Sequence, residues 1–266
     1  MKKIILATVL AGIGSTAALA ADIGAAAPYA KAPAMMAPVA SWTGWYIGGN
    51  VGYGFMKSSD SITGANAAGA AFAVPGGVIA TSIPLDSHAL IGGGQFGYNW
   101  QVSPRWVVGV EADMSWTDMN KMVAAPGPAD PTRIMPATEK FDWIGTARGR
   151  VGFIPVDRLL VFGTGGLAYG HASLSTALTR IRLDGTVICT GNNCQNGSTS
   201  ETRVGWTIGG GAEWAFTSNW SLKAEYLYYD LGTVSHTMTD PSFPSIFNAA
   251  VRLNGNVVRA GVNYHF

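Results

Sequence analysis

The chain has 266 residues, a formal net charge of +1 and only 12% charged residues, whereas glycine occurs 35 times. The balanced charge excludes the basic surface typical of nucleic-acid binding, and the glycine content is roughly double the average for proteins. Aromatic residues are abundant, with nine Trp, nine Tyr and ten Phe. The length suits one domain, or a barrel with long loops.

The first twenty residues have the three parts of a secretory signal peptide. Lys2 and Lys3 form a basic start, an apolar segment begins at Ile4, and Ala-Leu-Ala at 18–20 provides a cleavage site. We therefore expect residues 1–20 to be removed during export. The rest of the chain contains no long uncharged apolar run, so any crossing of a membrane must use strands.

Residues 21–41 are rich in Ala and Pro, and Pro28, Pro33 and Pro38 are evenly spaced. This composition is typical of an extended or disordered linker. We expect a periplasmic tether here, with a partner-binding segment as the alternative.

From residue 42 onward the sequence predicts strand after strand, with no convincing helical period. Eight strands are expected, at about residues 43–57, 88–102, 105–116, 139–154, 158–173, 201–217, 219–232 and 253–266. Tight turns join three pairs of strands, whereas four connections are long, at about residues 58–87, 117–138, 174–200 and 233–252. In outer-membrane barrels short turns face the periplasm and long loops face outside. The sequence therefore predicts an all-β fold over residues 42–266, an eight-stranded antiparallel transmembrane β-barrel with three short periplasmic turns and four long extracellular loops.

Most of these strands have one apolar face and one polar face. In residues 105–116, Trp106 and Trp116 share the apolar face, whereas Glu111 and Asp113 share the other. The apolar face of a transmembrane barrel contacts lipid, so the charged residues should point into the lumen; a soluble ligand-binding barrel would show the opposite arrangement. The charged residues predicted to lie in the lumen are Glu111, Asp113, Arg148, Arg150, Glu213, Lys223, Glu225 and Arg259. Because eight strands enclose little more room than side chains need, we expect these groups to pair and largely plug the lumen.

The aromatic residues predict two belts at the membrane surfaces. One group lies beside the tight turns and the C-terminal residue, and the other lies near the long connections: Trp116, Phe141, Tyr169, Trp206 and Tyr228. Trp106 and Trp116 are about 33 Å apart along an extended strand at ~3.3 Å per residue. With a strand tilt of roughly 40°, this separation corresponds to about 25 Å of height, which matches the apolar band of a membrane barrel.

Four segments resemble a known family. They are the opening Trp-Thr-Gly-Trp-Tyr-Ile-Gly-Gly-Asn at 42–50, glycine-rich stretches at 48–54 and 92–98, and the closing Val-Asn-Tyr-His-Phe at 262–266. The chain resembles the small OmpA-type outer-membrane β-barrels, and among them the major surface outer-membrane proteins of alphaproteobacteria. The resemblance implies an eight-stranded barrel, a role in envelope integrity and surface exposure, and an insertion signal in the last strand, which would include Tyr264 and Phe266.

The two cysteines, Cys189 and Cys194, lie close together in the segment CTGNNC. Export to an oxidising compartment favours a small-loop disulfide between them. A metal site would require further ligands at suitable spacing, and none lie nearby in the sequence.

Three histidines, His88, His171 and His236, are predicted to lie toward the extracellular rim. Histidines at one rim can bind haem or a metal, although solvated rim residues are the simpler interpretation. Ser173, Ser175 and Glu201 lie near the same rim, but no spacing marks a nucleophile and its base. We therefore expect no enzymatic activity, no metal and no cofactor.

These features together predict a structural surface protein of the outer membrane of a Gram-negative bacterium. The alternative is a small porin-like channel, or a surface protein that binds haem or another ligand. The expected partners are outer-membrane lipid, lipopolysaccharide and the barrel-assembly machinery, with no nucleic acid; whether the loops bind a host or other extracellular ligand stays open.

Overall fold

The computed structural model describes residues 41–74, 76–188, 194–240 and 243–266. The chain divides into two compact units, residues 1–37 and residues 38–266, and all described residues belong to the second. The predicted signal peptide and nearly all of the predicted linker lie outside the described residues.

Eight long strands make up most of the described chain. They are β1 (Gly44–Met56), β4 (Ser87–Ser103), β5 (Trp106–Pro126), β6 (Arg133–Val156), β7 (Leu159–Ile181), β9 (Cys194–Ala215), β10 (Trp220–Asp240) and β11 (Phe243–His265). The shorter elements are β2 (Ser59–Gly64), α1 (Ala67–Phe72), β3 (Ser82–Pro84) and β8 (Val187–Ile188). No helix in the described ranges is long and apolar enough to cross a membrane.

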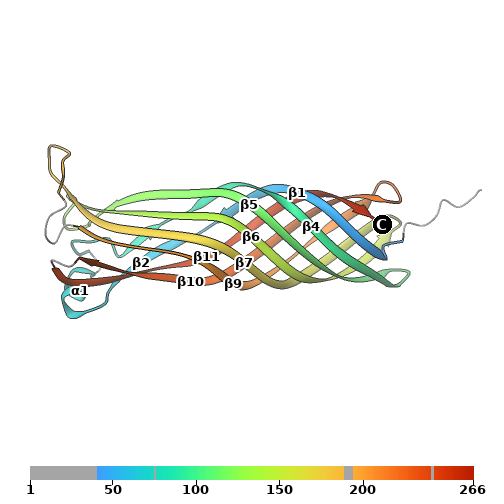
Figure 1. Cartoon of the computed structure of the whole chain (residues 1–266), viewed down its shortest axis with the longest axis horizontal. Helices are drawn as coiled ribbons and strands as arrows, with labels where there is room; N and C mark the ends of the chain where they lie inside the picture. The colour runs from blue at the N-terminus through green and yellow to red at the C-terminus, as the bar shows by residue number, and fades with distance from the viewer. Residues whose placement is uncertain (1–40, 75, 189–193, 241–242) are drawn as a thin grey trace, which may run out of the picture. The chain divides into compact units, whose positions relative to one another are not determined.

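The eight long strands close into a ring. Each pairs in antiparallel fashion with the next in the order β1-β4-β5-β6-β7-β9-β10-β11, and β11 pairs back with β1. Closure satisfies the backbone groups at what would otherwise be two free sheet edges. Figure 1 shows the tilted strands, with the C-terminus at one end of the barrel and α1 at the other. The predicted eight-stranded antiparallel barrel is therefore confirmed.

The three tight turns lie at the same end as the C-terminus. Ser103 pairs with Trp106 across the first turn and Val156 with Leu159 across the second, and residues 216–219 make the third. Arg158, in the second turn, has a φ of 70°, which lies in the left-handed region that non-glycine residues seldom adopt outside turns. This end faces the periplasm, and the opposite end faces outside.

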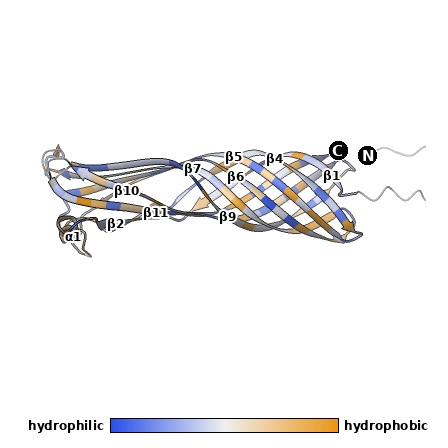
Figure 2. Ribbon diagram, turned by 60° about the horizontal axis from the view of Figure 1, so that its bottom comes forward, coloured by the Kyte–Doolittle hydropathy of each residue, from blue (hydrophilic) through white to orange (hydrophobic). Residues whose placement is uncertain are grey.

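The part of the barrel nearer the periplasmic end is apolar on its outer surface. Trp106 is 50% exposed and Trp116 is 58% exposed at the two ends of one outward face of β5. Figure 2 shows hydrophobic residues alternating with hydrophilic ones along the strands of this part. The alternation reflects the period of two in a strand, which places successive side chains on opposite faces. We call this part the lipid-facing band.

The strands extend well beyond the lipid-facing band, and this corrects the predicted bounds of three of the four long loops. β5 continues to Pro126 and β6 begins at Arg133, so only residues 127–132 of the expected loop at 117–138 connect the two strands. β7 and β9, and likewise β10 and β11, extend in the same way. Outside the membrane the wall faces water on its outer side, so these extensions lack the lipid-facing pattern used to recognise the strands.

A β-bulge corrects the prediction for Phe141, which was expected in the aromatic belt near the long connections. The β5–β6 register shifts between the pairs Trp116–Trp143 and Met119–Phe141. Against β7 the register also shifts, between the pairs Trp143–His171 and Phe141–Ala172, so Asp142 is an extra residue of β6 there. Across it the inward-pointing side chains of β6 change from even-numbered to odd-numbered residues, and Phe141 is therefore fully buried. The other aromatic residues predicted for this belt lie on the outer face of the barrel.

Residues 58–74 and 76–85 form what we call the closing segment. Its β2 pairs with the extracellular part of β11, its β3 pairs with β2, and the Ala129 amide donates a hydrogen bond to the Gly77 carbonyl at 2.9 Å. The segment therefore bridges from β11 to the turn between β5 and β6. It contains the one helix of the described residues, α1, whose first turn is capped by Asn66, which accepts a hydrogen bond from the Gly69 amide.

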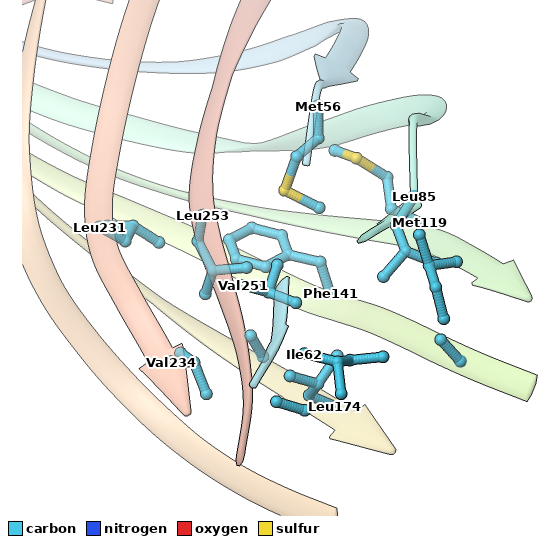
Figure 3. Packing of buried hydrophobic residues seen from close by; sticks show 14 of the residues in the cluster. Met56, Ile62, Leu85, Met119, Phe141, Leu174, Leu231, Val234, Val251 and Leu253 are labelled. Carbon is cyan, nitrogen blue, oxygen red and sulfur yellow. The ribbon is translucent and has the colours of Figure 1, made fainter. Parts of the chain in front are cut away.

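An apolar cluster fills the extracellular part of the barrel. The closing segment contributes Ile62 and Ile83, and the walls contribute Phe141, Met119 and Phe247, all of them at most 2% exposed. Figure 3 shows side chains from the walls and from the closing segment converging in this interior. This apolar cluster, with its 26 buried members, was not predicted from the sequence.

Candidate functional site

The interior of the lipid-facing band contains all eight charged residues that were predicted to lie in the lumen. They come from β5, β6, β9, β10 and β11, and each is between 0% and 5% exposed. Four are acidic and four are basic, so their formal charges cancel. We call this set the lumen network: Glu111, Asp113, Arg148, Arg150, Glu213, Lys223, Glu225 and Arg259.

Arg148 is the centre of the lumen network. From β6, its guanidinium donates to Glu111 and to Asp113 (2.8 Å), both on the neighbouring β5, and to Glu225 (2.7 Å) on β10. Two strands, β7 and β9, separate β6 from β10 in the ring, so the bond to Glu225 crosses the lumen. One side chain thus links opposite walls, as a planar guanidinium with several donors can.

Two further cations complete the central cluster. Arg259 on β11 donates to both carboxylate oxygens of Asp113, each at 2.9 Å, and to Glu225 at 2.9 Å. Lys223 on β10 donates to the two oxygens of Glu111 at 2.6 and 2.7 Å. Each of the three central carboxylates therefore contacts at least two cations, which compensates the loss of hydration on burial.

A second, smaller group lies nearer the periplasmic end. Arg150 donates to Glu213 at 2.9 Å and lies over the ring of Phe162, 4.1 Å from its centroid. Glu213 also accepts hydrogen bonds from Ser221 at 2.6 Å and from Asn263 at 2.7 Å. This carboxylate is thus held by one cation and several neutral donors.

The strand register explains why these residues meet. Glu111 and Arg148 are cross-strand partners on β5 and β6, and Glu225 and Arg259 are partners on β10 and β11. Side chains of such partners point to the same face of a sheet at short separation. The lipid-facing residues determine which side chains of each strand point inward. The register between adjacent strands then brings inward side chains of opposite charge together.

The neutral partners of the network were not predicted from the sequence. The Tyr46 hydroxyl donates to Glu111 at 2.6 Å, and Gln95 donates to Asn263 at 2.6 Å. Tyr46 was placed in the first predicted strand and in the opening motif but was given no inward role, although it lies between the outward-facing Trp45 and Ile47 and must therefore point inward. The alternation in β1 therefore contained the necessary signal.

The structure does not bring the three rim histidines together. His88 is exposed on β4, and His171 on β7 stacks on Trp143, with ring centroids 6.3 Å apart. His236 instead lies buried inside the extracellular part of the barrel. Within the described ranges no group of three or more His, Cys, Asp or Glu residues could hold a metal ion.

The remaining predicted residues lie at the two ends of the barrel. Tyr264 and Phe266 are on the outer face at the periplasmic end, where the Phe266 amide donates to the Trp45 carbonyl at 3.0 Å. Cys194 begins β9 at the extracellular end and is disulfide-bonded, whereas Cys189 lies outside the described residues. The expected pairing of the two cysteines and the insertion role of the last strand stay predictions.

A closed ring of eight antiparallel strands, apolar outside and charged inside, defines the class of outer-membrane β-barrels. The family described as outer membrane protein beta-barrel domain matches residues 9–266, and the chain belongs to this family. It is an outer-membrane protein of the Gram-negative type.

The chain is also similar to individual outer-membrane proteins. The 31 kDa outer-membrane immunogenic protein of Brucella melitensis is 35% identical over 266 residues, which cover 100% of both chains. The 22 kDa outer membrane protein of Rhizobium leguminosarum is 27% identical over 86% of this chain and 80% of its own length. The crystal structure of OprG from Pseudomonas aeruginosa matches 84% of this chain and 96% of its own, with a TM-score of 0.49 and 16% identity.

Proposed function

We propose that the protein is a non-enzymatic structural barrel of the cell surface, which contributes to envelope integrity and whose lumen is closed by paired charges. The observation that supports this best is Arg148, which ties β6 to carboxylates on β5 and β10 across the lumen. The apolar cluster above the lumen network supports the same conclusion, because it fills the extracellular part of the interior.

Surface exposure is supported by the Brucella relatives, which are named outer-membrane immunogenic proteins. The expected partners follow from the same assignment: lipopolysaccharide and lipid around the apolar band, and the assembly machinery that would recognise the last strand with Tyr264 and Phe266. The lipid-facing side chains of this band are large and apolar, as contact with acyl chains requires.

The test is the conductance of the refolded mature chain in a planar bilayer. We expect small or intermittent conductance, because the lumen network leaves little open bore between eight strands. Folding is checked by gel migration, since a closed barrel resists SDS until it is heated. A large and steady conductance of the folded protein would contradict the closed lumen and favour the porin-like alternative.

A further inference from the structure

The closing segment is joined to the barrel wall at its two ends, Ser58 and Leu85. The Leu85 amide donates to the Ser58 carbonyl at 2.9 Å, and the Ser58 hydroxyl donates to the Leu85 carbonyl at 3.0 Å. From the wall, Glu139 on β6 also contacts the Ser58 hydroxyl oxygen through Oε2. A single carboxyl group thus reaches the point where the closing segment leaves and rejoins the barrel.

These contacts contain one proton too few if Glu139 is ionised. The Ser58 hydroxyl has one proton to donate, and it faces two acceptors, the Leu85 carbonyl oxygen and Glu139 Oε2. Both contacts are full two-centre hydrogen bonds only if Glu139 carries a proton and donates it to the Ser58 oxygen. The other oxygen of Glu139, Oε1, is buried without a hydrogen-bond partner among the described residues, as suits a neutral acid better than a carboxylate.

The surroundings of Glu139 supply no compensating cation. Glu139 is 2% exposed and lies beside the apolar cluster. Lys121 is its cross-strand partner on β5, but no ion pair joins them in the described part of the chain. From β7 the partner is the apolar Leu174.

The remaining titratable groups near Glu139 come from β2 and β10. Asp60 on β2 is fully buried, accepts a hydrogen bond from Thr176 at 2.7 Å and leaves its other oxygen unpartnered. Tyr229 and His236 on β10 are also buried, and neither the Tyr229 hydroxyl nor the two His236 ring nitrogens have partners among the described residues. An ionised Glu139 would therefore face a second acid in an apolar interior.

We propose that Glu139 is a proton-operated latch: its protonated carboxyl holds the closing segment against the wall, and loss of the proton loosens that segment. Burial, assisted by the neighbouring Asp60, raises the pKa of Glu139 to about 7, against the opposing effect of a hydrogen bond that Ser58 would donate to the ionised form. Burial likewise raises the pKa of Asp60, whereas it lowers the pKa of His236.

The sign of the effect follows from linkage. The folded pKa of Glu139 lies above its ordinary value of 4.5, so the stabilisation is complete below that value and is lost as pH rises through about 7. Asp60 acts in the same direction. Protonation of His236 acts oppositely at lower pH, and we therefore choose pH 6 and pH 8 for the comparison. Between these values the equilibrium constant for closing should fall about tenfold.

Hydrogen exchange measured by mass spectrometry on the refolded full chain tests the latch. The reporters are the Leu85 amide, bonded to Ser58, and the Ile62 amide, which donates to Thr81 at 3.0 Å. After correction for intrinsic exchange, their protection should fall about tenfold from pH 6 to pH 8, the change that linkage gives. Amides of β5 within the lipid-facing band should keep their protection.

Glu139→Gln should remove most of this pH dependence and leave only the contribution of Asp60. Glutamine has the shape of the protonated acid and can donate to Ser58, so the variant should fold and stay closed at both pH values. Glu201→Gln, which changes a carboxyl group on β9 whose side chain is 37% exposed, is the matched control and should keep the wild-type response. Asp60→Asn should shift the midpoint to lower pH, because it removes the neighbouring negative charge.

Two outcomes would overturn the latch. Equal protection of the Leu85 and Ile62 amides at pH 6 and pH 8 in the wild-type protein would show that no proton controls the segment. A tenfold change that persists in Glu139→Gln would assign the proton to another group. Both readouts are independent of conductance, so they do not depend on whether the lumen network closes the pore.

Discussion

The barrel encloses two regions with opposite chemistry. Inside the lipid-facing band the interior is charged, and Arg148 is bonded to three carboxylates. Beyond the band, toward the outside, the interior is apolar and Phe141 and Phe247 are almost completely buried. The strands are continuous through both regions, so the difference does not arise from a change of fold.

The medium outside the barrel wall, lipid or water, explains why the interior changes from charged to apolar. Lipid requires apolar side chains on the outside of the band, which leaves the polar ones for the lumen. Beyond the membrane the outside faces water, and the same strands can place polar residues outward and apolar residues inward. Lys140 and Asp142 form an outward ion pair at 2.8 Å, directly beside the inward Phe141. The register shifts of β6 against β5 and β7, between Phe141 and Trp143, mark the place where the interior changes from charged to apolar.

Arg148→Ala should have the largest effect on the charged region. It leaves Glu111, Asp113 and Glu225 buried with one cation fewer at their centre. Removal of one member of a buried ion-pair cluster typically costs about 3–5 kcal/mol, because the remaining charges lose compensation. The free energy of unfolding should fall by this amount in urea titrations of the refolded barrel in detergent, and the gap should raise conductance.

Arg180→Ala is the matched control for that variant. Arg180 is exposed at the outer end of β7 and lies far along the strand from the lumen network. Its removal should change the free energy of unfolding by no more than about 0.5 kcal/mol. If Arg148→Ala behaved like Arg180→Ala, the lumen network would contribute no stability and the comparison of the two regions would fail.

Phe141→Ala should destabilise the apolar region by about 3 kcal/mol, the lower end of the range for buried aromatic residues. The side chain stacks near Tyr229, with ring centroids 6.2 Å apart, and its loss leaves a cavity. Hydrogen exchange should become faster beyond the band but stay slow within it. Met122→Ala, at a position 67% exposed, should leave both regions unchanged. Faster exchange within the band after Phe141→Ala would show that the two regions unfold as one.

The charged region could be predicted from the sequence, because lipid contact imposes one strict rule. Once Trp106 and Trp116 are assigned to the outside, strand parity places Glu111 inside, and the register of adjacent strands places Arg148 beside it. The same alternation places the side chain of Tyr46 inside the barrel, but its segment was interpreted as a family motif and this contact was not predicted. The prediction needed only periodicity, which is a local property.

The apolar region could not be predicted in this way, because outside the membrane no single rule fixes the parity. Residues 117–138 contain Pro and charged residues that resemble a loop, and nothing in them shows that Met119 and Met135 point inward. A bulge shifts the parity by one residue, and its position depends on pairing across strands. The closing segment depends on contacts with β11, far away in the sequence.

Tyr46→Phe should have a smaller effect than the first two changes. It removes the hydroxyl that donates to Glu111 at 2.6 Å, while Lys223 and Arg148 still contact the same carboxylate. A hydrogen bond to a charged group contributes about 1.5–3 kcal/mol, and the remaining cations favour the lower value. Tyr169→Phe removes an outward-facing hydroxyl and should be neutral. Equal losses of unfolding free energy in the two variants would show that the loss in Tyr46→Phe does not come from the hydrogen bond to Glu111.

The smallest effect should come from the cysteines, because Cys194 begins β9 at the extracellular end, far along the strand from the lumen network. We expect mass spectrometry of the non-reduced protein to find no free thiol, since export exposes Cys189 and Cys194 to oxidation. Reduction should change the free energy of unfolding by no more than about 0.5 kcal/mol, the scale of surface changes. The Cys189→Ser, Cys194→Ser double variant should match the reduced protein in urea and keep its heat-dependent gel migration. Two free thiols in the exported protein would refute the disulfide. A loss of several kcal/mol in unfolding free energy on reduction would show that the disulfide stabilises the apolar region.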